Sequence, residues 1–167
     1  IIQAFAQLNA TVLDLDEVLM VGLDMLVQAF HYQAVIVSLI NDETQKPIIK
    51  ASKGDLPASL QDKLQVSIEA VVTSGVLEKE ADFWLYEQHD QHSTCLIIPL
   101  TVGRLVIGAF SIINADFSAS EEQILAILAS QMTVAITNSQ LYEKIREQQQ
   151  QEFIRRQAAM HLQELST

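Results

Sequence analysis

The side chains whose types could support chemistry are few, and the most concentrated set lies near the middle of the chain. His89, Asp90 and His92 are of the types that bind a transition metal. A metal site needs three or four converging ligands, each oriented by further hydrogen bonds. This stretch is polar and has no regular pattern, so the sequence favours a solvated surface and predicts no metal site.

Cys95 is the only cysteine, so it can form neither an intrachain disulfide nor a thiolate zinc cage. A reactive thiolate needs exposure and nearby positive charge, whereas Cys95 begins an apolar segment of an acidic chain. A buried, unreactive thiol is therefore favoured. The sequence also offers no defensible Ser/His/Asp spacing, phosphate-binding glycine loop or paired-carboxylate motif, so no catalytic residue is predicted.

Four residues are candidates for contact with a small ligand. Ser38 and Ser111 lie in segments that otherwise look buried, and a buried hydroxyl needs a partner. A bond to nearby backbone is the favoured interpretation, and lining of a pocket is the alternative. Trp84 and Tyr86 lie two apart, so in an extended segment they share a face and could close over a planar ligand. Packing of this segment onto the body of the protein is favoured over that role.

The composition limits the partners. The chain has 167 residues, 49% of them hydrophobic, and a formal net charge of −11, which fits one domain with extensions. An acidic surface repels phosphate backbones and anionic lipid headgroups, so nucleic acid binding and direct membrane insertion are not expected. No apolar run reaches the ~18 residues of a membrane span. The single cysteine and the lack of a visible signal peptide fit a cytoplasmic protein, and Ile1 in place of methionine suggests a fragment of a longer protein.

Apolar periodicity predicts two helices before the first strand. Residues 1–12 have the spacing of a linker helix that began upstream. Asp14 and Glu17 form a capping box for a second helix, which extends to Phe30. His31 follows an apolar helix end and is expected to cap its last carbonyl groups.

Short apolar stretches predict an antiparallel sheet built from two hairpins. The predicted strands are residues 34–40, 47–51, 95–101 and 105–114. All four look apolar throughout, so helices must cover both faces of the sheet. Between the hairpins, the sequence predicts a short helix after Pro57, another at 67–73 ended by Gly75, and an irregular segment at 76–91.

The last third of the chain predicts one long helix. Ser118 and Glu121 form a capping box, and neither proline nor glycine follows before Thr167. A helix of this length extends beyond a domain of this size, so its end must project or pair. It has one apolar stripe at Leu125, Leu128, Met132, Ala135 and Ile136.

A second stripe on this helix, here called the seam, has the alternating spacing of four and three that suits a parallel helical partner. The seam consists of Ile127, Gln131, Val134, Asn138, Leu141, Ile145 and Gln148. We expect the first stripe to face the sheet and the seam to form a homodimer interface, chiefly through Ile127, Val134, Asn138, Leu141 and Ile145. Asn138 would fix the register at some cost in stability. A fully buried core helix is the alternative. Beyond Gln148 the seam weakens.

Four stretches together resemble the GAF domain family of sensor modules, which occur in histidine kinases, phosphodiesterases, cyclases and phytochromes. They are residues 13–19 (LDLDEVL), 34–42, 70–75 (AVVTSG) and 96–110, the last followed by Ile113 and Asn114. The resemblance covers about 13–145. It implies an α+β fold with a central antiparallel sheet of five or six strands, terminal helices on one face and a small-ligand pocket on the other. Thr73 then joins Ser38, Trp84, Tyr86 and Ser111 as a candidate for ligand binding.

The resemblance also bears on cofactors. Members that bind cyclic nucleotides often have an Asn-Lys pair, a later Phe and then Asp-Glu. Here Asn114 is followed by Ala115, and Phe117 by Glu121 and Glu122, so the lysine is missing and a cyclic nucleotide is not expected.

Bilin-binding members attach their chromophore to a cysteine, often followed by histidine, in the irregular segment. Cys95 begins a strand and is followed by Leu96, which argues against covalent bilin, and reduction of free methionine sulfoxide uses several cysteines. No cofactor is predicted.

The residues and the resemblance together predict a non-catalytic regulatory domain of a multidomain signalling protein, such as a two-component histidine kinase. It would bind a small ligand, dimerise, or both, and signal through its terminal helices. A purely structural dimerisation module without a ligand is the alternative. The expected divisions are a linker helix at 1–12, the sensor domain at 13–147 and a coiled-coil extension at 148–167.

Overall fold

The computed structural model describes residues 14–74, 82–88, 91–114 and 117–166, without the side chains of Ser59, Ser74 and residues 82–94. The predicted linker helix at 1–12 lies outside these residues. In chain order the elements are α2 (Leu15–Phe30), β1 (Ala34–Ile40), β2 (Pro47–Gly54), α3 (Ala58–Ser74), β3 (Asp82–Gln88), β4 (Gln91–Val102), β5 (Leu105–Asn114) and α4 (Ala119–Leu165).

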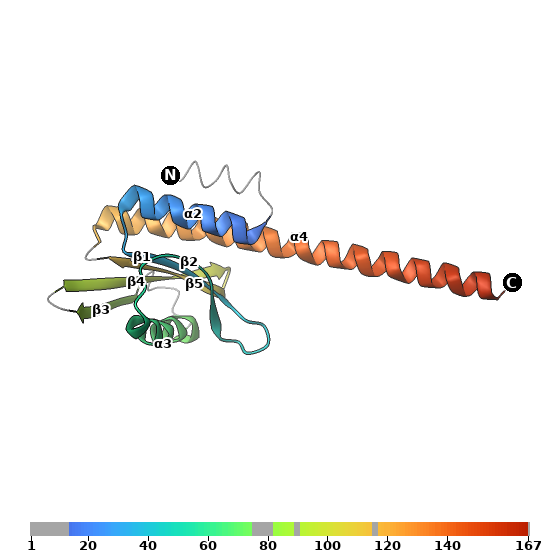
Figure 1. Ribbon diagram of the computed structural model, residues 1–167, viewed down its shortest axis with the longest axis horizontal. Helices are drawn as coiled ribbons and strands as arrows, with labels where there is room; N and C mark the ends of the chain where they lie inside the picture. The colour runs from blue at the N-terminus through green and yellow to red at the C-terminus, as the bar shows by residue number, and fades with distance from the viewer. Residues whose placement is uncertain (1–13, 75–81, 89–90, 115–116, 167) are drawn as a thin grey trace.

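The strands form one antiparallel sheet in the order β2-β1-β5-β4-β3. Helices α2 and α4 cover one face of it, and α3 covers the other (Figure 1). The predicted α+β class, the antiparallel sheet and the long C-terminal helix are therefore confirmed. Both predicted hairpins are present, and Gly103 at the second turn has the left-handed φ of 60° that suits glycine.

Helix α2 begins and ends where the sequence predicts. The Asp14 carboxylate accepts the backbone N–H of Asp16 at 3.1 Å, which satisfies one of the free donors of the first turn. His31 does cap the other end, but through its backbone. Its φ is 56°, and its N–H donates to the Val27 carbonyl at 2.8 Å.

The side chains of the central strands alternate between two apolar cores. On the side of α2 and α4 lie Val35, Val37, Leu96, Phe110 and Ile112, packed against Leu19, Leu23, Leu125 and Leu128. On the side of α3 lie Ala34, Ile36, Ile97, Ala109 and Ile113, packed against Leu60, Leu64 and Ile68. The two-fold period of a strand thus gives each helical layer its own half of the apolar surface.

Three sequence predictions about elements are wrong. The two short helices are a single helix, α3, which presents Leu60, Leu64 and Ile68 on one face. The segment at 76–91 is not irregular throughout, because it contains strand β3 at the sheet edge. Strand β2 is not apolar throughout, because it is the other edge strand, and Ile48 and Ile49 are exposed by 51% and 40%.

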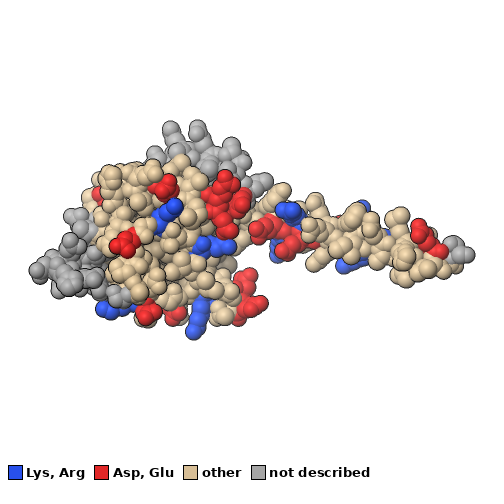
Figure 2. Space-filling model, viewed as in Figure 1, with Lys and Arg blue, Asp and Glu red and all other residues tan. Residues whose placement is uncertain are grey.

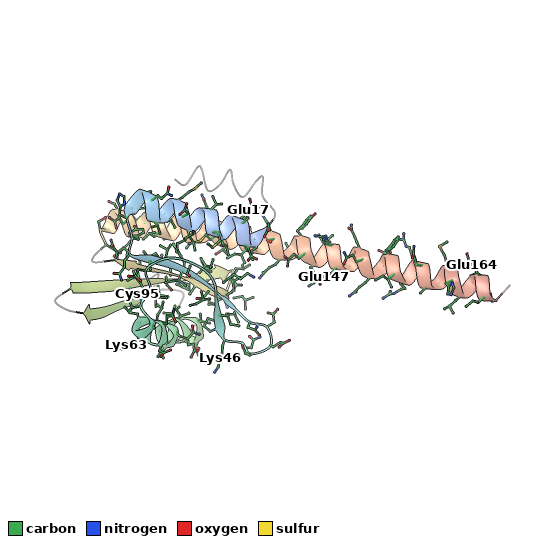
Figure 3. The ribbon with its side chains drawn as sticks, in the orientation of Figure 1. Glu17, Lys46, Lys63, Cys95, Glu147 and Glu164 are labelled. Atoms are coloured by element: carbon green, nitrogen blue, oxygen red, sulfur yellow. The ribbon has the colours of Figure 1, made fainter. Side chains whose placement is uncertain are left out.

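Helix α4 is a single helix with two different halves. Ser118 caps it by accepting the N–H of Glu121 at 3.1 Å. Its buried residues extend no further than Ser139, and the rest of the helix projects away from the sheet (Figure 1), with Glu147 and Glu164 on the projecting part (Figure 3). By length and composition alone, α4 contains a stretch apolar enough to cross a membrane, a test that core helices also pass, and 39% of that stretch is buried.

Candidate ligand site and dimer interface

Two serines lie on the α3 side of the sheet, on neighbouring strands. Ser38 of β1 pairs with Ala109 of β5, and Ser111 of β5 pairs with Ile36 of β1. The two serines are therefore diagonal neighbours, about 7–8 Å apart between Cα atoms. Each alternates along its strand with residues of the core under α3, so both hydroxyls face that core.

Both hydroxyl groups are fully buried and unsatisfied. Ser38 and Ser111 have 0% exposure, and neither Oγ atom has a hydrogen-bond partner among the described residues. The favoured sequence interpretation, a bond to nearby backbone, does not hold in this structure. A buried polar group without a hydrogen-bond partner costs roughly 1–3 kcal/mol. Binding of a group that forms hydrogen bonds with these two hydroxyls would therefore be favourable.

The surroundings of the two serines are otherwise apolar. The described side chains of this core are aliphatic, apart from Cys95, which is 1% exposed, as predicted for a buried thiol. Figure 3 places Cys95 on the sheet, toward α3. Among the described residues, no Lys, Arg, Asp or Glu side chain is buried, so the interior around the two serines offers hydrogen-bonding groups but no charge.

The other predicted ligand contacts are not brought to the serines by the described structure. Thr73 lies in the last turn of α3 and is exposed. The backbones of Trp84 and Tyr86 pair with Cys95 and Ser93 in the sheet, and their side chains lie outside the described part of the chain. The metal candidates His89 and Asp90, and the His92 side chain, also lie outside it. Within the described residues no group of three His, Cys, Asp or Glu residues is placed to hold a metal ion.

The seam of α4 is exposed on the side away from the sheet core. Its apolar members Ile127, Val134, Leu141 and Ile145 are 48%, 54%, 53% and 53% exposed, and Asn138 is exposed as well. The other stripe is buried, as the sequence predicts: Leu125, Leu128, Met132 and Ile136 have 0% exposure, and Ala135 has 8%. Asp and Glu side chains gather around the point where α4 leaves the domain (Figure 2). The helix thus belongs to the core and offers a second apolar surface.

An aromatic cluster fixes the start of α4 to the end of α2. Tyr32 is stacked on Phe30, with ring centroids 5.3 Å apart, and lies 5.8 Å from the Phe117 ring. The Tyr32 hydroxyl donates to Glu121 Oε2 at 3.4 Å, in the first turn of α4. Burial raises the pKa of Tyr32 well above its usual range, and the negative charge of Glu121 and the hydrogen bond to it add to the shift.

We expect this junction to make stability depend on pH in alkaline solution. Tyrosine in the unfolded chain ionises near pH 10, whereas folded Tyr32 stays protonated, so the unfolded state loses a proton that the folded state keeps. The free energy of unfolding should then fall by up to about 1.4 kcal/mol per pH unit above pH ~10. Urea unfolding at several pH values should show a shallower fall for Tyr32→Phe. Parallel pH profiles for the two proteins would contradict this account.

The comparisons with known proteins agree with this architecture. The sequence profile of the GAF domain family matches residues 14–136, and the chain belongs to this family. GAF domains are generally non-catalytic regulatory modules. Among curated proteins, none matches the sequence significantly.

Solved structures share the fold at low sequence identity. A GAF domain of an Acinetobacter phosphoenolpyruvate-protein phosphotransferase is 19% identical, with a TM-score of 0.63, covering 84% of this chain and 92% of that one. Residues 122 to 287 of a methyl-accepting chemotaxis protein are 17% identical (TM-score 0.62; 83% and 98%). The free methionine-R-sulfoxide reductase of Neisseria meningitidis is 15% identical (TM-score 0.64; 84% and 89%). These likenesses show the fold, and membership of the GAF domain family indicates a sensory or regulatory domain.

Proposed function

We propose that this chain is a non-catalytic sensory module of a cytoplasmic multidomain signalling protein. It binds a small ligand between the sheet and α3, forms a homodimer through its terminal helices and passes the signal along them. The full-length protein would carry an output domain such as a histidine kinase, and no cofactor is required. The observation that supports ligand binding best is the pair of buried hydroxyls, Ser38 and Ser111, without partners among the described residues.

The chemistry around these serines favours an uncharged ligand with a largely apolar body. Two hydroxyls can each donate and accept a hydrogen bond, and the aliphatic side chains around them offer only contact area. A phosphate would lose its hydration without a cationic partner from the described core, which is unfavourable. For this reason the proposal includes no cyclic nucleotide as the ligand.

Alanine at either serine tests this proposal. Ser38→Ala and Ser111→Ala each remove an unsatisfied group, so the ligand-free protein should gain about 1 kcal/mol in unfolding free energy. Native mass spectrometry of the purified wild-type protein should show a co-purified small molecule, which the double variant lacks. Ser52→Ala, at an exposed position of β2, is the matched control and should change neither property.

A loss of stability in the serine variants relative to the ligand-free wild-type protein would contradict the proposal, because it would mean that the hydroxyls already have partners within the chain. A wild-type protein that carries no small molecule, and whose melting temperature no ligand panel shifts, would favour the second candidate function, a structural dimerisation module. One observation supports that alternative. Leu60, Leu64 and Ile68 of α3 are at most 1% exposed, so α3 already packs closely on the sheet.

The proposed dimer is supported by the exposed seam. Four large apolar side chains, which lie seven, seven and four residues apart along one face, are what a parallel helical partner would bury. A change in the position of α4 on the sheet would then change how the two seams meet, and the segment 148–167 would carry that change toward an output domain.

A further inference from the structure

A groove runs beside the seam, between α4 and the end of the β4–β5 hairpin. Its volume is about 420 Å³. One wall comes from the sheet and the other from two turns of α4. The lining residues are Pro99, Thr101, Val102, Ala129, Ser130, Thr133, Val134, Thr137 and Asn138.

Apart from Asn138, the helical wall presents few free hydrogen-bond donors. Ser130, Thr133 and Thr137 each donate their hydroxyl to the backbone carbonyl four residues earlier, at 3.2, 2.9 and 2.8 Å. Their donors are therefore occupied within the helix. Val102 and Val134, which are 44% and 54% exposed, complete an apolar surface on opposite walls. The groove suits a side chain with an apolar body better than a polar small molecule.

The groove and the proposed dimer interface share residues. Val134 and Asn138 belong to the seam and also line the groove. A second helix laid along the seam would therefore cover the open side of the groove. Because the seam and the groove share these residues, a second copy of the chain is the occupant that best fits the groove.

Coiled-coil geometry indicates which side chain of the second copy lies nearest the groove. With Gln131, Asn138 and Ile145 at position a, and Val134 and Leu141 at d, Thr137 takes position g and Tyr142 takes position e. In a parallel pair, a g residue of one helix meets the e residue five positions further along the other helix. Helical side chains also tilt toward the N-terminus, which brings the Tyr142 ring back toward the level of the groove. The Tyr142 side chain is 46% exposed and does not line the groove of its own chain.

We propose that the partner's Tyr142 occupies the groove between α4 and the β4–β5 hairpin. This inference rests on the parallel dimer proposed above and specifies how it contacts the sheet. The ring lies between Val102 on the hairpin and Thr137 on α4, so each protomer's helix touches the other protomer's sheet. The dimer interface is then sensitive to the position of β4, which pairs with β5, the strand that contains Ser111.

Cross-linking separates this proposal from the dimer itself. The Leu141→Cys variant has a cysteine at a seam position, and it should form an interchain disulfide if the helices pair in parallel. A mixture of Val102→Cys and Tyr142→Cys proteins, re-equilibrated and treated with a short bismaleimide, should give a cross-linked dimer. Each of these two proteins alone should give none. The unsubstituted chain, whose Cys95 is 1% exposed, measures the background.

Cross-linking of Leu141→Cys without cross-linking of the mixture would overturn the placement of Tyr142 and leave the dimer standing. Failure of Leu141→Cys to cross-link would instead contradict the parallel dimer, and therefore also the placement of Tyr142.

Dimer affinity provides a second measurement that does not depend on a cross-linker. Tyr142→Ala should raise the dissociation constant of the dimer about tenfold, whereas Tyr142→Phe, which keeps the ring, should stay within about threefold. Val66→Ala, at a 68% exposed position of α3 on the opposite side of the sheet, is the matched control. An unchanged dissociation constant for Tyr142→Ala in a chain that dimerises would refute the placement.

Discussion

Glutamate at Val134 and Leu141 is expected to convert the protein from a dimer into a folded monomer. Both side chains are more than half exposed in the single chain, so a charge there costs little in the monomer. In a parallel dimer, each substitution places two carboxylates close together in an apolar seam. Such a desolvated pair costs about 2–4 kcal/mol, so the double variant should raise the dissociation constant at least about a thousandfold.

Sedimentation velocity over a range of concentrations measures this change directly. Val66→Glu adds the same charge at a comparably exposed position on α3 and should remain dimeric. Circular dichroism should show that the sheet domain of the double variant unfolds at nearly the wild-type temperature, with helix content reduced by fraying of the projecting part of α4. A double variant that stays dimeric would place the interface elsewhere on the molecule.

Alanine at Gly108 is expected to destabilise the sheet strongly. Gly108 lies in β5 opposite Leu39, and a Cβ atom there would collide with the backbone carbonyl oxygen of Ser38 and press on Leu39. The strands β1 and β5 must separate locally to accept it, which we expect to lower the free energy of unfolding by roughly 3–4 kcal/mol. The same displacement moves Ser38, so ligand binding should weaken together with stability.

Gly103→Ala is a control that separates the steric clash of an added Cβ atom from the strain of a left-handed backbone conformation. Gly103 has a φ of 60°, but a Cβ atom there meets nothing within 4 Å. The substitution should therefore cost only the ~1–2 kcal/mol of a left-handed alanine. Chemical denaturation of the two variants compares them directly. Equal losses of unfolding free energy for Gly103→Ala and Gly108→Ala would show that the close approach of β1 and β5 does not determine the cost of a side chain at position 108.

Local residue patterns were enough to predict the starts of the helices and the two stripes of α4. Asp14 and Ser118 precede helical periodicity and cap the helices, as side chains of their types do. The two stripes of α4 were separable because Ile127 and Leu128, though adjacent in sequence, lie on different faces of the helix: one is 48% exposed and the other fully buried. The sequence does not tell what covers the exposed stripe.

The errors have physical causes as well. Ser67 resembles a helix start, and apolar Val66 before it breaks the pattern of Leu60, Leu64 and Ile68. Val66 is in fact 68% exposed on the outer face of a continuous helix. Strand β3 was missed although Phe83, Trp84 and Tyr86 are of types that favour strands, because charged and polar residues flank this short run on both sides, as an edge strand allows.

The candidate site was only partly predictable. Ser38 and Ser111 were identifiable as polar residues inside apolar strands, but their diagonal placement depends on the pairing of β1 with β5, which only the register provides. The groove beside α4 gave no sequence signal. It joins Val102 to Thr137, and these residues meet only because α4 crosses the sheet over β4.

The division of α4 at Ser139 also has a mechanical consequence. Beyond this last buried residue, residues 140–165 form a straight arm about 39 Å long at ~1.5 Å per residue. A tilt of about 5° at the rim of the sheet would move the far end by roughly 3 Å, while buried side chains near the pivot shift by a fraction of an ångström. Through this geometry, a displacement small enough for a close-packed core would become one of roughly 3 Å at the far end of α4.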